Sequence, residues 1–351
     1  MSTVSISHEH WMRRCLELAQ SAEGLTYPNP MVGSVIVHQG KIIGEGYHSQ
    51  AGGPHAEVHA INAVKNQDLL REATLYVNLE PCAHFGKTPP CSLLISQKKI
   101  PRVVVGCVDS FSEVAGKGIA HLRSTGTEVI SGVLEKESRE LNRRFFTFHE
   151  KKRPYILLKW AQTTDGFIDI DREAQKGGRP TWITNAHARR AVHLWRSREQ
   201  AILVGSETAL KDNPSLTVRD WHGPHPLRLV LDRGGRLPDY LDLFDGTCPT
   251  LLYTQKEQRD NKQAERILLQ AGAEPLSELL KDLHQRNIQS LIVEGGARLL
   301  QTFIDAGLWD EARVFTGKTW FQKGVRAPQL QGFPAQQQDF GNSTLYYFRN
   351  I

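Results

Sequence analysis

The most constraining feature of this sequence is a set of metal-binding side chains that lie far apart along the chain. His55 offers an imidazole, Cys82 and Cys91 offer thiols, and Glu57 follows the histidine by two residues. Zinc binds imidazole nitrogen and thiolate sulfur, and a catalytic zinc site takes three protein ligands and leaves the fourth position to water. Glu57 is close enough to move the protons of that water without binding the metal. The chain must therefore fold so that side chains from residues 55 to 91 meet at one ion.

The order of these residues follows the His-x-Glu … Pro-Cys-x-x-Cys signature of zinc deaminases, since Pro81 precedes the first cysteine. One departure is that eight residues, and not two, separate the cysteines. Two other interpretations remain open. Isolated buried His or Cys residues usually only pack, and a structural zinc site is closed by a fourth ligand, for which His84 is the candidate. The carboxylate of Glu57 favours a catalytic site over a structural one.

The connection Ala83–Pro90 is punctuated by glycine and proline, which predicts a shaped loop and not a longer helix. His84, Lys87 and Thr88 can all bind phosphate oxygens, although most lysines are simply solvated. Asn29 lies between two prolines just before a predicted strand. It is either a turn former or an amide that hydrogen-bonds a heterocycle, because its side chain can donate and accept at once.

Length and composition indicate a globular protein of two domains. A chain of 351 residues is long for one hydrophobic core, and a content of 40% hydrophobic and 23% charged residues excludes a disordered chain. We place the domains at residues 1–148 and 149–351, with Thr147–Pro154 as the link between them.

The net charge and the number of cysteines indicate which ligands the protein can bind and in which compartment it works. The net charge of +5 is mild and suits an anionic small molecule as well as nucleic acid. The five scattered cysteines fit a reducing cytosol better than a disulfide framework. Residues 1–14 hold no apolar signal segment, and no apolar run approaches the roughly 20 residues that span a bilayer. We therefore expect a cytoplasmic protein with no membrane partner.

Hydrophobic periodicity predicts alternating helices and strands in the first half. The expected helices are 8–21, 55–64 and 91–98, and the expected strands are 32–38, 41–46, 74–79, 102–108 and 128–130. Pro81 is expected to begin a helix or turn. This would put both His55 and Cys82 at helix N-termini, where a thiol is easily held as thiolate.

The second half predicts an open, mainly parallel α/β sheet, in which ligands sit at the carboxyl ends of strands. The expected strands are 155–161, 200–205, 227–231, 249–254 and 290–293, and the expected helices are 185–198, 257–271 and 297–306. Lys159, Arg233, Glu294 and the segment Ser206–Thr208 fall at or near the ends of these strands.

Two features of the second half indicate a nucleotide. The glycine turn Glu294-Gly295-Gly296 between a strand and a helix can offer backbone N–H groups to a phosphate, although a tight turn without a ligand is the simpler interpretation of this feature alone. Asp232-Arg233 places a cation near a ribose site, where it would accommodate the 2′-phosphate of NADP.

The chain resembles the bifunctional deaminase/reductase family of riboflavin biosynthesis over most of its length. In the first half the resemblance rests on Pro28-Asn29-Pro30-x-Val32-Gly33, Gly44-x-Gly46-x-His48, His55-Ala56-Glu57-x-His59-Ala60 and Glu80-Pro81-Cys82-x-His84-x-Gly86-Lys87-Thr88-Pro89-Pro90-Cys91. In the second half it rests on Lys159-x-Ala161, Asp165-Gly166, Trp182-Ile183-Thr184, Asp212-Asn213-Pro214-x-Leu216-Thr217-x-Arg219 and Glu294-Gly295-Gly296.

The resemblance implies a fold, two reactions and two cofactors. The fold is a cytidine-deaminase-like α/β/α domain followed by a dihydrofolate-reductase-like α/β domain. The first domain would use Zn²⁺ to deaminate 2,5-diamino-6-(5-phosphoribosylamino)pyrimidin-4(3H)-one by hydrolysis. The second would use NADPH to reduce the ribose of 5-amino-6-(5-phosphoribosylamino)uracil to a ribityl chain.

The resemblance also assigns residues by position. The metal ligands would be His55, Cys82 and Cys91, and the catalytic residues Glu57 and Lys159. Deaminase substrate contacts would be Asn29, His48, His84 and Lys87. Reductase substrate contacts would be Arg196, Leu216, Arg219 and Glu294, with the two arginines as candidates for the phosphate. NADP contacts would be Gln162, Trp182, Thr208, Asp212, Arg233 and Gly296.

Two stretches depart from the family pattern. Asp109–Ser112 stands where a Pro-containing turn is usual, and Pro180 stands where a small polar residue usually precedes the tryptophan by two. The second departure removes one expected substrate hydrogen bond, because proline has no N–H and no hydroxyl.

The expected partners are phosphorylated pyrimidine small molecules, with no nucleic acid, and a second copy of the chain in a homo-oligomer, either a dimer or a tetramer. The alternative is a zinc nucleobase or nucleic-acid deaminase with a degenerate, non-catalytic second domain. That alternative requires a basic groove with aromatic platforms, and the mild net charge and the long connection between the cysteines argue against it.

Overall fold

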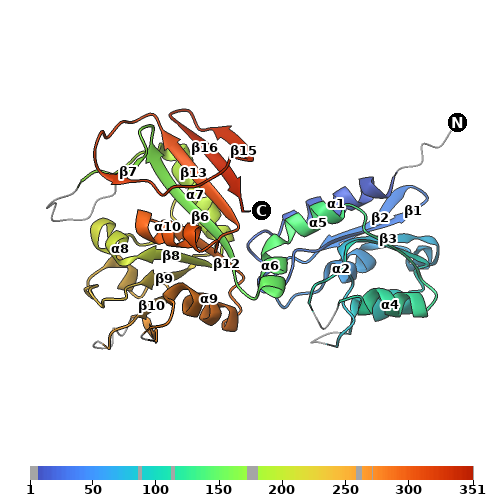
Figure 1. Cartoon of the computed structure of the whole chain (residues 1–351). Coiled ribbons are helices and arrows are strands. Elements are labelled where there is room, and N and C mark those ends of the chain that lie inside the picture. The colour runs from blue at the N-terminus through green and yellow to red at the C-terminus, as the bar shows by residue number, and fades with distance from the viewer. Residues whose placement is uncertain are drawn as a thin grey trace. The chain divides into compact units, whose positions relative to one another are not determined.

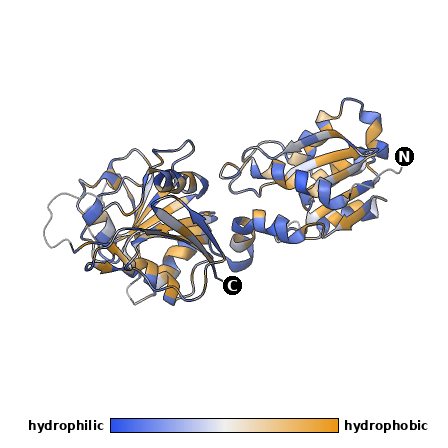
Figure 2. Cartoon of the chain, turned by 90° about the horizontal axis from the view of Figure 1, so that it is seen from above, coloured by the Kyte–Doolittle hydropathy of each residue, from blue (hydrophilic) through white to orange (hydrophobic). Residues whose placement is uncertain are grey.

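The computed structural model describes residues 7–85, 89–111, 115–171, 181–257, 263–270 and 272–350. The chain divides into two compact units, Met1–Lys151 and Lys152–Ile351, which we call the N-terminal and C-terminal units (Figure 1). Hydrophobic residues concentrate along the strands inside each unit (Figure 2). No helix in the described ranges is long and apolar enough to cross a membrane.

The N-terminal unit is built on a five-stranded sheet of order β2-β1-β3-β4-β5. Its strands are β1 (Gly33–His38), β2 (Lys41–Tyr47), β3 (Thr74–Leu79), β4 (Arg102–Cys107) and β5 (Glu128–Ser131). Strand β1 pairs antiparallel with β2 and β3, whereas β3, β4 and β5 are parallel. Most of the predicted strands of this half are therefore confirmed to within a few residues.

Helices cover both faces of this sheet. They are α1 (His8–Gln20), α2 (Ala56–Ala63), α3 (Cys91–Gln97), α4 (Lys117–Ser124), α5 (Glu135–Leu141) and α6 (Arg143–Lys151), with a 3-10 helix η1 (Gln67–Glu72). One hydrophobic cluster joins α1 to the face that carries Val35 and Val37, and another joins α2, α3 and α4 to the face that carries Ile36. Alternate residues of β1 thus face opposite layers, and the predicted α/β/α arrangement is confirmed.

One expectation for this unit is wrong in part. Pro81 was expected to begin a helix or turn, but no helix begins there: the described residues between β3 and α3 are irregular, and the next helix starts at Cys91. The segment Thr147–Pro154, predicted as the link between the domains, contains the boundary between the two units at Lys151 and Lys152. Helix α6 continues through it to Lys151, since Phe145, Phe146 and Phe148 are buried.

The C-terminal unit is built on a nine-stranded sheet of order β11-β10-β9-β8-β12-β6-β13-β16-β15. Its strands are β6 (Tyr155–Thr163), β8 (Ala201–Gly205), β9 (Leu227–Leu231), β10 (Thr250–Thr254), β11 (Glu265–Leu268), β12 (Ser290–Glu294), β13 (Glu311–Gly317), β15 (Gln336–Asp339) and β16 (Ser343–Arg349). All neighbours from β11 to β13 are parallel, and the last two pairings are antiparallel. The prediction of an open, mainly parallel sheet is confirmed. Strands β7 (Phe167–Asp169) and β14 (Val325–Arg326) form a separate antiparallel pair.

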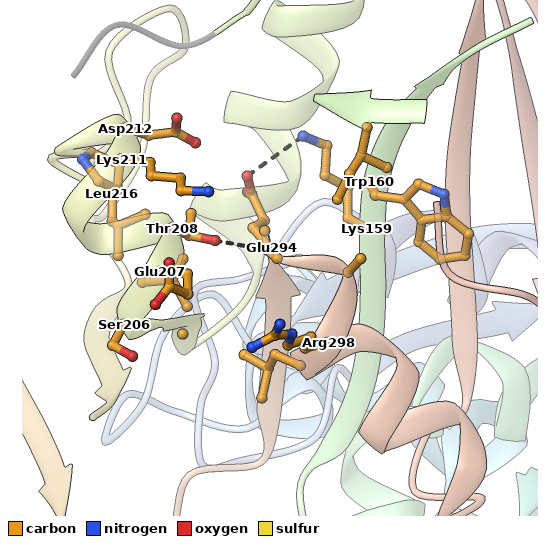
Figure 3. Close-up of a pocket in the computed structure, with 18 of the residues that line it drawn as sticks. Lys159, Trp160, Ser206, Glu207, Thr208, Lys211, Asp212, Leu216, Glu294 and Arg298 are labelled. Carbon is orange, nitrogen blue, oxygen red and sulfur yellow. Dashed lines mark hydrogen bonds and ion pairs between the residues drawn. The ribbon is translucent and has the colours of Figure 1, made fainter. Parts of the chain in front are cut away.

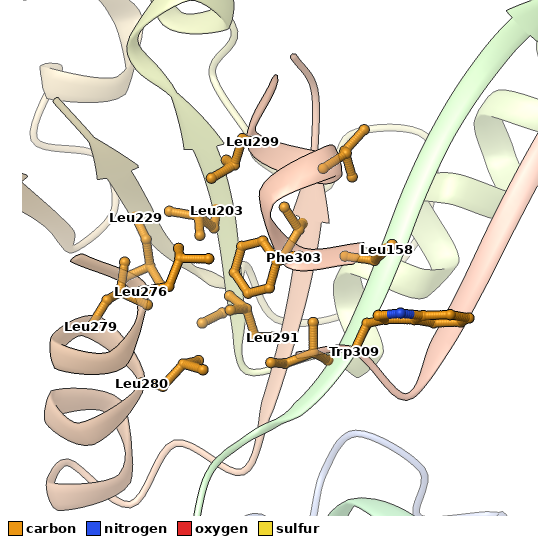
Figure 4. Close-up of a cluster of buried hydrophobic side chains, with 14 of the residues drawn as sticks. Leu158, Leu203, Leu229, Leu276, Leu279, Leu280, Leu291, Leu299, Phe303 and Trp309 are labelled. Carbon is orange, nitrogen blue, oxygen red and sulfur yellow. The ribbon is translucent and has the colours of Figure 1, made fainter. Parts of the chain in front are cut away.

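Helices also cover both faces of the large sheet. They are α7 (Ala186–Arg198), α8 (Ser206–Asp212), α9 (Pro275–Gln285) and α10 (Ala297–Asp305), with a 3-10 helix η2 (Asp242–Phe244). Helices α9 and α10 pack on one face through leucines and Phe303 (Figure 4), and α7 and α8 pack on the other. Asn185 caps α7 by accepting the N–H of Ala188, as expected of an N-cap asparagine.

The predicted helix 257–271 is wrong where the structure describes it. Residues 258–262 and 271 lie outside the described ranges. Glu265–Leu268 forms strand β11, which pairs in parallel with β10 and makes the edge of the sheet. Glutamate, glutamine and leucine favour helices locally, but pairing with an open sheet edge and packing of Ile267 on the core outweigh that propensity here.

Candidate active sites

The three predicted metal ligands converge in the N-terminal unit. His55 immediately precedes α2, Cys91 is the first residue of α3, and Cys82 lies in the irregular connection after β3. The Nδ1 atom of His55 lies 3.6 Å from the Cys82 sulfur and 3.3 Å from the Cys91 sulfur, and the three ligand atoms all lie within 4.8 Å of one another. One imidazole and two thiols at this spacing fit a zinc ion that keeps a position open to water.

The surroundings of Cys82 favour a thiolate. The Cys91 side chain, and after it His55, lower the pKa of Cys82 to about 4. The backbone N–H of Cys91 also donates to the Cys82 sulfur at 3.2 Å. Cys82 therefore receives an N–H from the start of a helix, although it does not itself begin one.

Glu57 lies in the first turn of α2, next to the metal ligands. Its side chain is buried, and this burial, supported by the charge of Cys82, raises the pKa of Glu57 to about 7. A carboxyl group whose pKa lies close to the working pH can both accept and return a proton. Glu57 is therefore placed and tuned for proton transfer beside the metal centre.

Asn29 and His48 form a hydrogen-bonded pair beside His55. The Nδ2 atom of Asn29 lies 3.0 Å from Nε2 of His48, and Nδ1 of His48 lies 3.0 Å from the carbonyl oxygen of Pro54. The carbonyl can only accept, so Nδ1 of His48 carries the proton and Nε2 accepts from Asn29. Burial lowers the pKa of His48, in agreement with a neutral ring. Both ring nitrogens of His48 are thus hydrogen-bonded. The bond from Nδ2 of Asn29 to His48 also fixes the direction in which the Oδ1 atom of Asn29 points.

The other two predicted deaminase contacts lie in the connection between the cysteines. The His84 ring packs edge-on against Phe111 with ring centroids 6.2 Å apart. Lys87 lies outside the described residues. Phe111 belongs to the stretch Asp109–Ser112 that departs from the family pattern, so an aromatic ring supports His84 at this point of the chain.

Glu80 is a residue of this site that sequence reasoning missed. Its buried carboxylate accepts backbone N–H groups from Asp109 at 3.2 Å, Gly116 at 2.9 Å and Ile119 at 3.1 Å. These bonds tie the connection between β4 and α4 to the residue that precedes Pro81-Cys82. The sequence signals were a carboxylate at the end of a predicted strand and its place at the start of the Glu80-Pro81-Cys82 motif, but neither indicated this role.

The C-terminal unit holds a cavity of about 1420 Å³ along the carboxyl edge of its sheet (Figure 3). Most predicted reductase residues line it, namely Lys159, Trp182, Arg196, Thr208, Asp212, Leu216, Arg219, Arg233, Glu294 and Gly296. Gln162 is not among the lining residues, and its side-chain oxygen accepts a hydrogen bond from Nε1 of Trp160 at 2.8 Å. Pro180 lies outside the described residues.

An ion network occupies the centre of this cavity. Glu294 ends β12 and stands level with Lys159 of the neighbouring β6, so their side chains meet with Nζ and Oε2 3.5 Å apart. The Nε and Nη2 atoms of Arg196 both donate to Glu294 at 2.8 Å, and Nη1 donates to the carbonyl of Thr217 at 3.2 Å. Strand β6 continues to Thr163, so Lys159 lies within the strand and not at its end.

Burial and charge act in opposition within the network. Burial lowers the pKa of Lys159, although Glu294 raises it. Burial by itself raises the pKa of Glu294, but Arg196 and Lys159 together outweigh this effect and lower it to about 2. The carboxylate is thus held ionised, and the lysine gives up its proton more readily than an exposed lysine does.

The glycine turn after β12 contacts α8. The N–H of Gly296 donates to Oγ1 of Thr208 at 2.7 Å, and Gly295 has φ +104°, which favours glycine. A Cβ on Gly295 would lie 2.7 Å from the Thr208 side chain. The turn therefore brings Thr208 and the N-terminus of α10 to one wall of the cavity.

Four basic side chains and one neutral histidine that line this cavity were not predicted, namely Arg189, Lys211, Arg236, Arg298 and His193. His193 lies one turn before Arg196 on α7, and burial lowers its pKa to about 4, so its ring is neutral and accepts the backbone N–H of Arg219. Helical spacing from Arg196 was the signal that could have found it. Arg189 lies on the same helix and Lys211 lies on α8, whereas Arg236 and Arg298 follow turns that the sequence did single out.

The N-terminal fold with its His/Glu/Cys/Cys centre is that of a zinc-dependent deaminase, and the C-terminal unit adds a polar cavity at the carboxyl edge of a parallel sheet, where such sheets bind nucleotides. Comparisons with known proteins agree. Residues 5–107 match the model of the cytidine and deoxycytidylate deaminase zinc-binding region, and residues 154–340 match the RibD C-terminal domain. The chain belongs to the RibD family of bifunctional deaminase/reductases of riboflavin biosynthesis.

Relatives match over nearly the whole chain. The riboflavin biosynthesis protein RibD of Aquifex aeolicus is 42% identical over 331 residues, which are 92% of this chain and 90% of that protein. The RibD of Escherichia coli is 38% identical over 93% of this chain and 89% of its own length. A crystal structure from Thermotoga maritima, a diaminohydroxyphosphoribosylaminopyrimidine deaminase/5-amino-6-(5-phosphoribosylamino)uracil reductase, has a TM-score of 0.88 at 37% identity and covers 97% of this chain and 98% of its own. The expected zinc and NADPH cofactors and the two-domain fold agree with this membership.

Proposed function

We propose that the N-terminal unit hydrolyses the 2-amino group of 2,5-diamino-6-(5-phosphoribosylamino)pyrimidin-4(3H)-one. We further propose that the C-terminal unit reduces the ribose of the resulting 5-amino-6-(5-phosphoribosylamino)uracil with NADPH. The observation that carries the proposal is the match to the Thermotoga deaminase/reductase over 97% of the chain, together with the formation of both sites from the expected residues.

In the deamination, His55, Cys82 and Cys91 would hold the zinc ion. Zinc lowers the pKa of a bound water from 15.7 towards ~7 and so supplies a hydroxide at neutral pH. Glu57 would take one proton from the attacking water and give it to the ring nitrogen. It would then pass the second proton, from the hydroxyl that has added to the ring carbon, to the leaving amine, so that ammonia departs and a carbonyl remains. Asn29, directed by His48, holds the pyrimidine ring through its side-chain amide.

In the reduction, NADPH supplies a hydride to C1 of the opened ribose. Lys159 donates a proton to the sugar oxygen that becomes a hydroxyl, and Glu294 and Arg196 hold the lysine at this point. Arg219 is the better placed of the two predicted phosphate ligands. Its side chain is exposed at the cavity and hydrogen-bonds only Ser215 among the described residues, whereas the three nitrogens of Arg196 all have protein hydrogen-bond partners.

The proposed partners are small phosphorylated pyrimidines and a second copy of the chain, without nucleic acid, in the cytoplasm. The mild net charge of +5 and the five unpaired cysteines support this setting. The ordered ion network at the centre of the C-terminal cavity supports a working second domain over a degenerate one.

The test is to incubate the purified protein with the diaminopyrimidine phosphoriboside, with and without NADPH, and to follow ammonia release and NADPH loss separately. We expect ammonia in both reactions, and NADPH loss only after ammonia has appeared. A Lys159→Ala variant should release ammonia at the normal rate but reduce the deaminated intermediate slowly. Ammonia release from tRNA or single-stranded DNA, but not from the phosphoriboside, would reject the proposal.

A further inference from the structure

The segment that carries Asn29 lies outside regular secondary structure until β1 begins at Gly33. It runs beside the metal centre, because Asn29 is bonded to His48, whose ring packs edge-on against that of His55 with centroids 5.6 Å apart. Met31 is buried, and buried backbone N–H and C=O groups need hydrogen-bond partners even where no strand supplies them. The partners of this segment therefore decide how firmly Asn29 is held.

Two buried asparagines bind the backbone of the segment. Oδ1 of Asn142 accepts the N–H of Met31 at 2.8 Å, and Nδ2 of Asn142 donates to the carbonyl oxygen of Met31 at 2.9 Å. Nδ2 of Asn78 donates to the same carbonyl at 3.1 Å, and its Oδ1 accepts the N–H of Gly33 at 2.8 Å. The Asn142 amide thus exchanges two hydrogen bonds with one residue, as a residue of a paired antiparallel strand does.

The two asparagines reach this segment from different parts of the chain. Asn78 belongs to β3, whereas Asn142 lies between α5 and α6 and is 111 residues from Met31 in sequence. The helices hold Asn142 through its backbone, since its N–H donates to the carbonyl of Ser138 and its carbonyl accepts the N–H of Phe146. The match to the deaminase zinc-binding region ends at residue 107. A part of the unit beyond that region thus supports the segment next to the metal centre.

Two further contacts restrain the same segment. The N–H of His48 donates to the carbonyl of Val32 at 2.9 Å. A Cβ on Gly33 would lie 2.1 Å from the carbonyl oxygen of Cys15, so the backbone of α1 approaches here as closely as glycine allows. The segment cannot shift as a whole without breaking one of these contacts, and Asn142 provides two of its hydrogen bonds.

We propose that Asn142 is a positioning residue for the deamination, because with Asn78 it holds Met31 and so sets where the Asn29 amide meets the pyrimidine ring. The proposal rests on the proposed deaminase function, since it concerns the same substrate. Pro30 carries the restraint from Met31 to Asn29, because its ring fixes the φ angle of the single residue between them. Without Asn142, the buried N–H of Met31 loses its acceptor and the segment rearranges to satisfy it.

The experiment is steady-state ammonia release from the diaminopyrimidine phosphoriboside by the full-length protein. Asn142→Ala should raise the KM about tenfold, the value of one to two lost hydrogen bonds. Its kcat should stay within about threefold of the wild type, and its zinc content should be normal, because His55 and Glu57 do not depend on this segment. Amide hydrogen exchange of residues 29–33 should increase.

A double-mutant cycle with Asn29 separates positioning from a general loss of stability. Asn29→Ala should itself raise the KM, because it removes the amide that binds the ring. In that background, Asn142→Ala should change the KM by about twofold or less, since the group that it positions is already absent. A tenfold effect of Asn142→Ala that persists in the Asn29→Ala background would overturn the proposal, and so would an unchanged KM in the single variant.

Thr127 provides the matched control. Its Oγ1 atom donates a buried hydrogen bond to the carbonyl of Ile100 at 3.4 Å, at the amino end of the parallel strands and not at the end that leads to Cys82. Thr127→Val should leave the KM unchanged. Asn142→Ser is measured in parallel, so that the test does not depend on the folding of Asn142→Ala, and its KM should rise in the same direction. No ammonia release from the wild type would reject the proposed function itself, whereas the outcomes named for the Asn142 variants reject this proposal alone.

Discussion

Arg196 and Glu294 form a bidentate ion pair inside the reductase cavity, with Nε and Nη2 of the arginine each 2.8 Å from a carboxylate oxygen. The arginine comes from α7 and the glutamate ends β12, so the pair joins a helix on one face of the sheet to the edge where Lys159 lies. A buried carboxylate held at two points cannot rotate away from the lysine. The pair therefore fixes the position of the proposed proton donor.

The first prediction concerns the stability that this pair provides. The Glu294→Gln variant leaves two buried cations without a carboxylate, and we expect the free energy of unfolding at pH 7 to fall by about 3–5 kcal/mol. Six of the seven tryptophans lie in the C-terminal unit, so tryptophan fluorescence during urea denaturation reports on this unit. The exposed Glu207→Gln variant is the control and should change stability by about 1 kcal/mol or less.

The same variant gives a pH dependence with a definite sign. The pKa of Glu294 in the folded protein is about 2, below its ordinary value of 4.5. The ionised carboxylate therefore stabilises the fold fully above about pH 4.5, and this contribution is lost as the pH falls from 4.5 towards 2. The stability gap between wild type and Glu294→Gln should shrink over this window. A gap that stays constant down to pH 2 would contradict the pairing.

The second prediction separates the two activities. In Glu57→Gln the metal ligands are untouched, so the zinc content should stay normal, whereas deamination should fall by about 10²- to 10⁴-fold because proton transfer is lost. Reduction of the deaminated intermediate should be unchanged. Zinc is measured by metal analysis and deamination by ammonia release, with the exposed Glu137→Gln variant as control. Normal ammonia release from Glu57→Gln would remove this residue from the mechanism.

The third prediction is that metal binding and local folding are lost together in the N-terminal unit. Cys82 and Cys91 anchor the irregular connection before α3, so Cys82→Ser should lose zinc and increase amide hydrogen exchange in α2 and α3. A chelator should do the same to the wild type. The Cys248→Ala variant, altered in the C-terminal unit, should retain zinc. Retention of stoichiometric zinc by Cys82→Ser would place the ligand elsewhere.

Residue chemistry allowed the metal centre to be predicted, but not the local structure that supports it. One imidazole and two thiols in a known order determine a zinc site whatever the backbone between them does. The start of α3 at Cys91 was predicted, but the course of the chain after Pro81 was not, because proline tolerates both a helix start and an irregular connection, and the structure adopts the second. The support from Glu80 depends on three backbone N–H groups from later in the chain, which no local pattern reveals.

In the C-terminal unit the sequence located the edge of the sheet but not the contacts made there. Lys159 and Glu294 were both expected near strand ends, yet their pairing depends on β6 and β12 being neighbours, and these strands are far apart in sequence. The edge strand β11 was taken for a helix because its residues favour one locally. The double contact of Arg196 with Glu294 likewise emerges only from the folded chain, and it changes which arginine is the better phosphate ligand.

The last prediction tests that choice. Arg219 is exposed at the cavity, so Arg219→Met should raise the KM for the deaminated intermediate about tenfold to a hundredfold through loss of a charge-assisted phosphate contact. With the dephosphorylated intermediate the variant and the wild type should have the same KM, because the contact no longer exists in either. Arg196→Met should instead slow reduction of both substrates, since it releases Glu294 and Lys159 and not only the phosphate. If the Arg196 defect vanished with the dephosphorylated substrate while the Arg219 defect persisted, the two assignments would have to be exchanged.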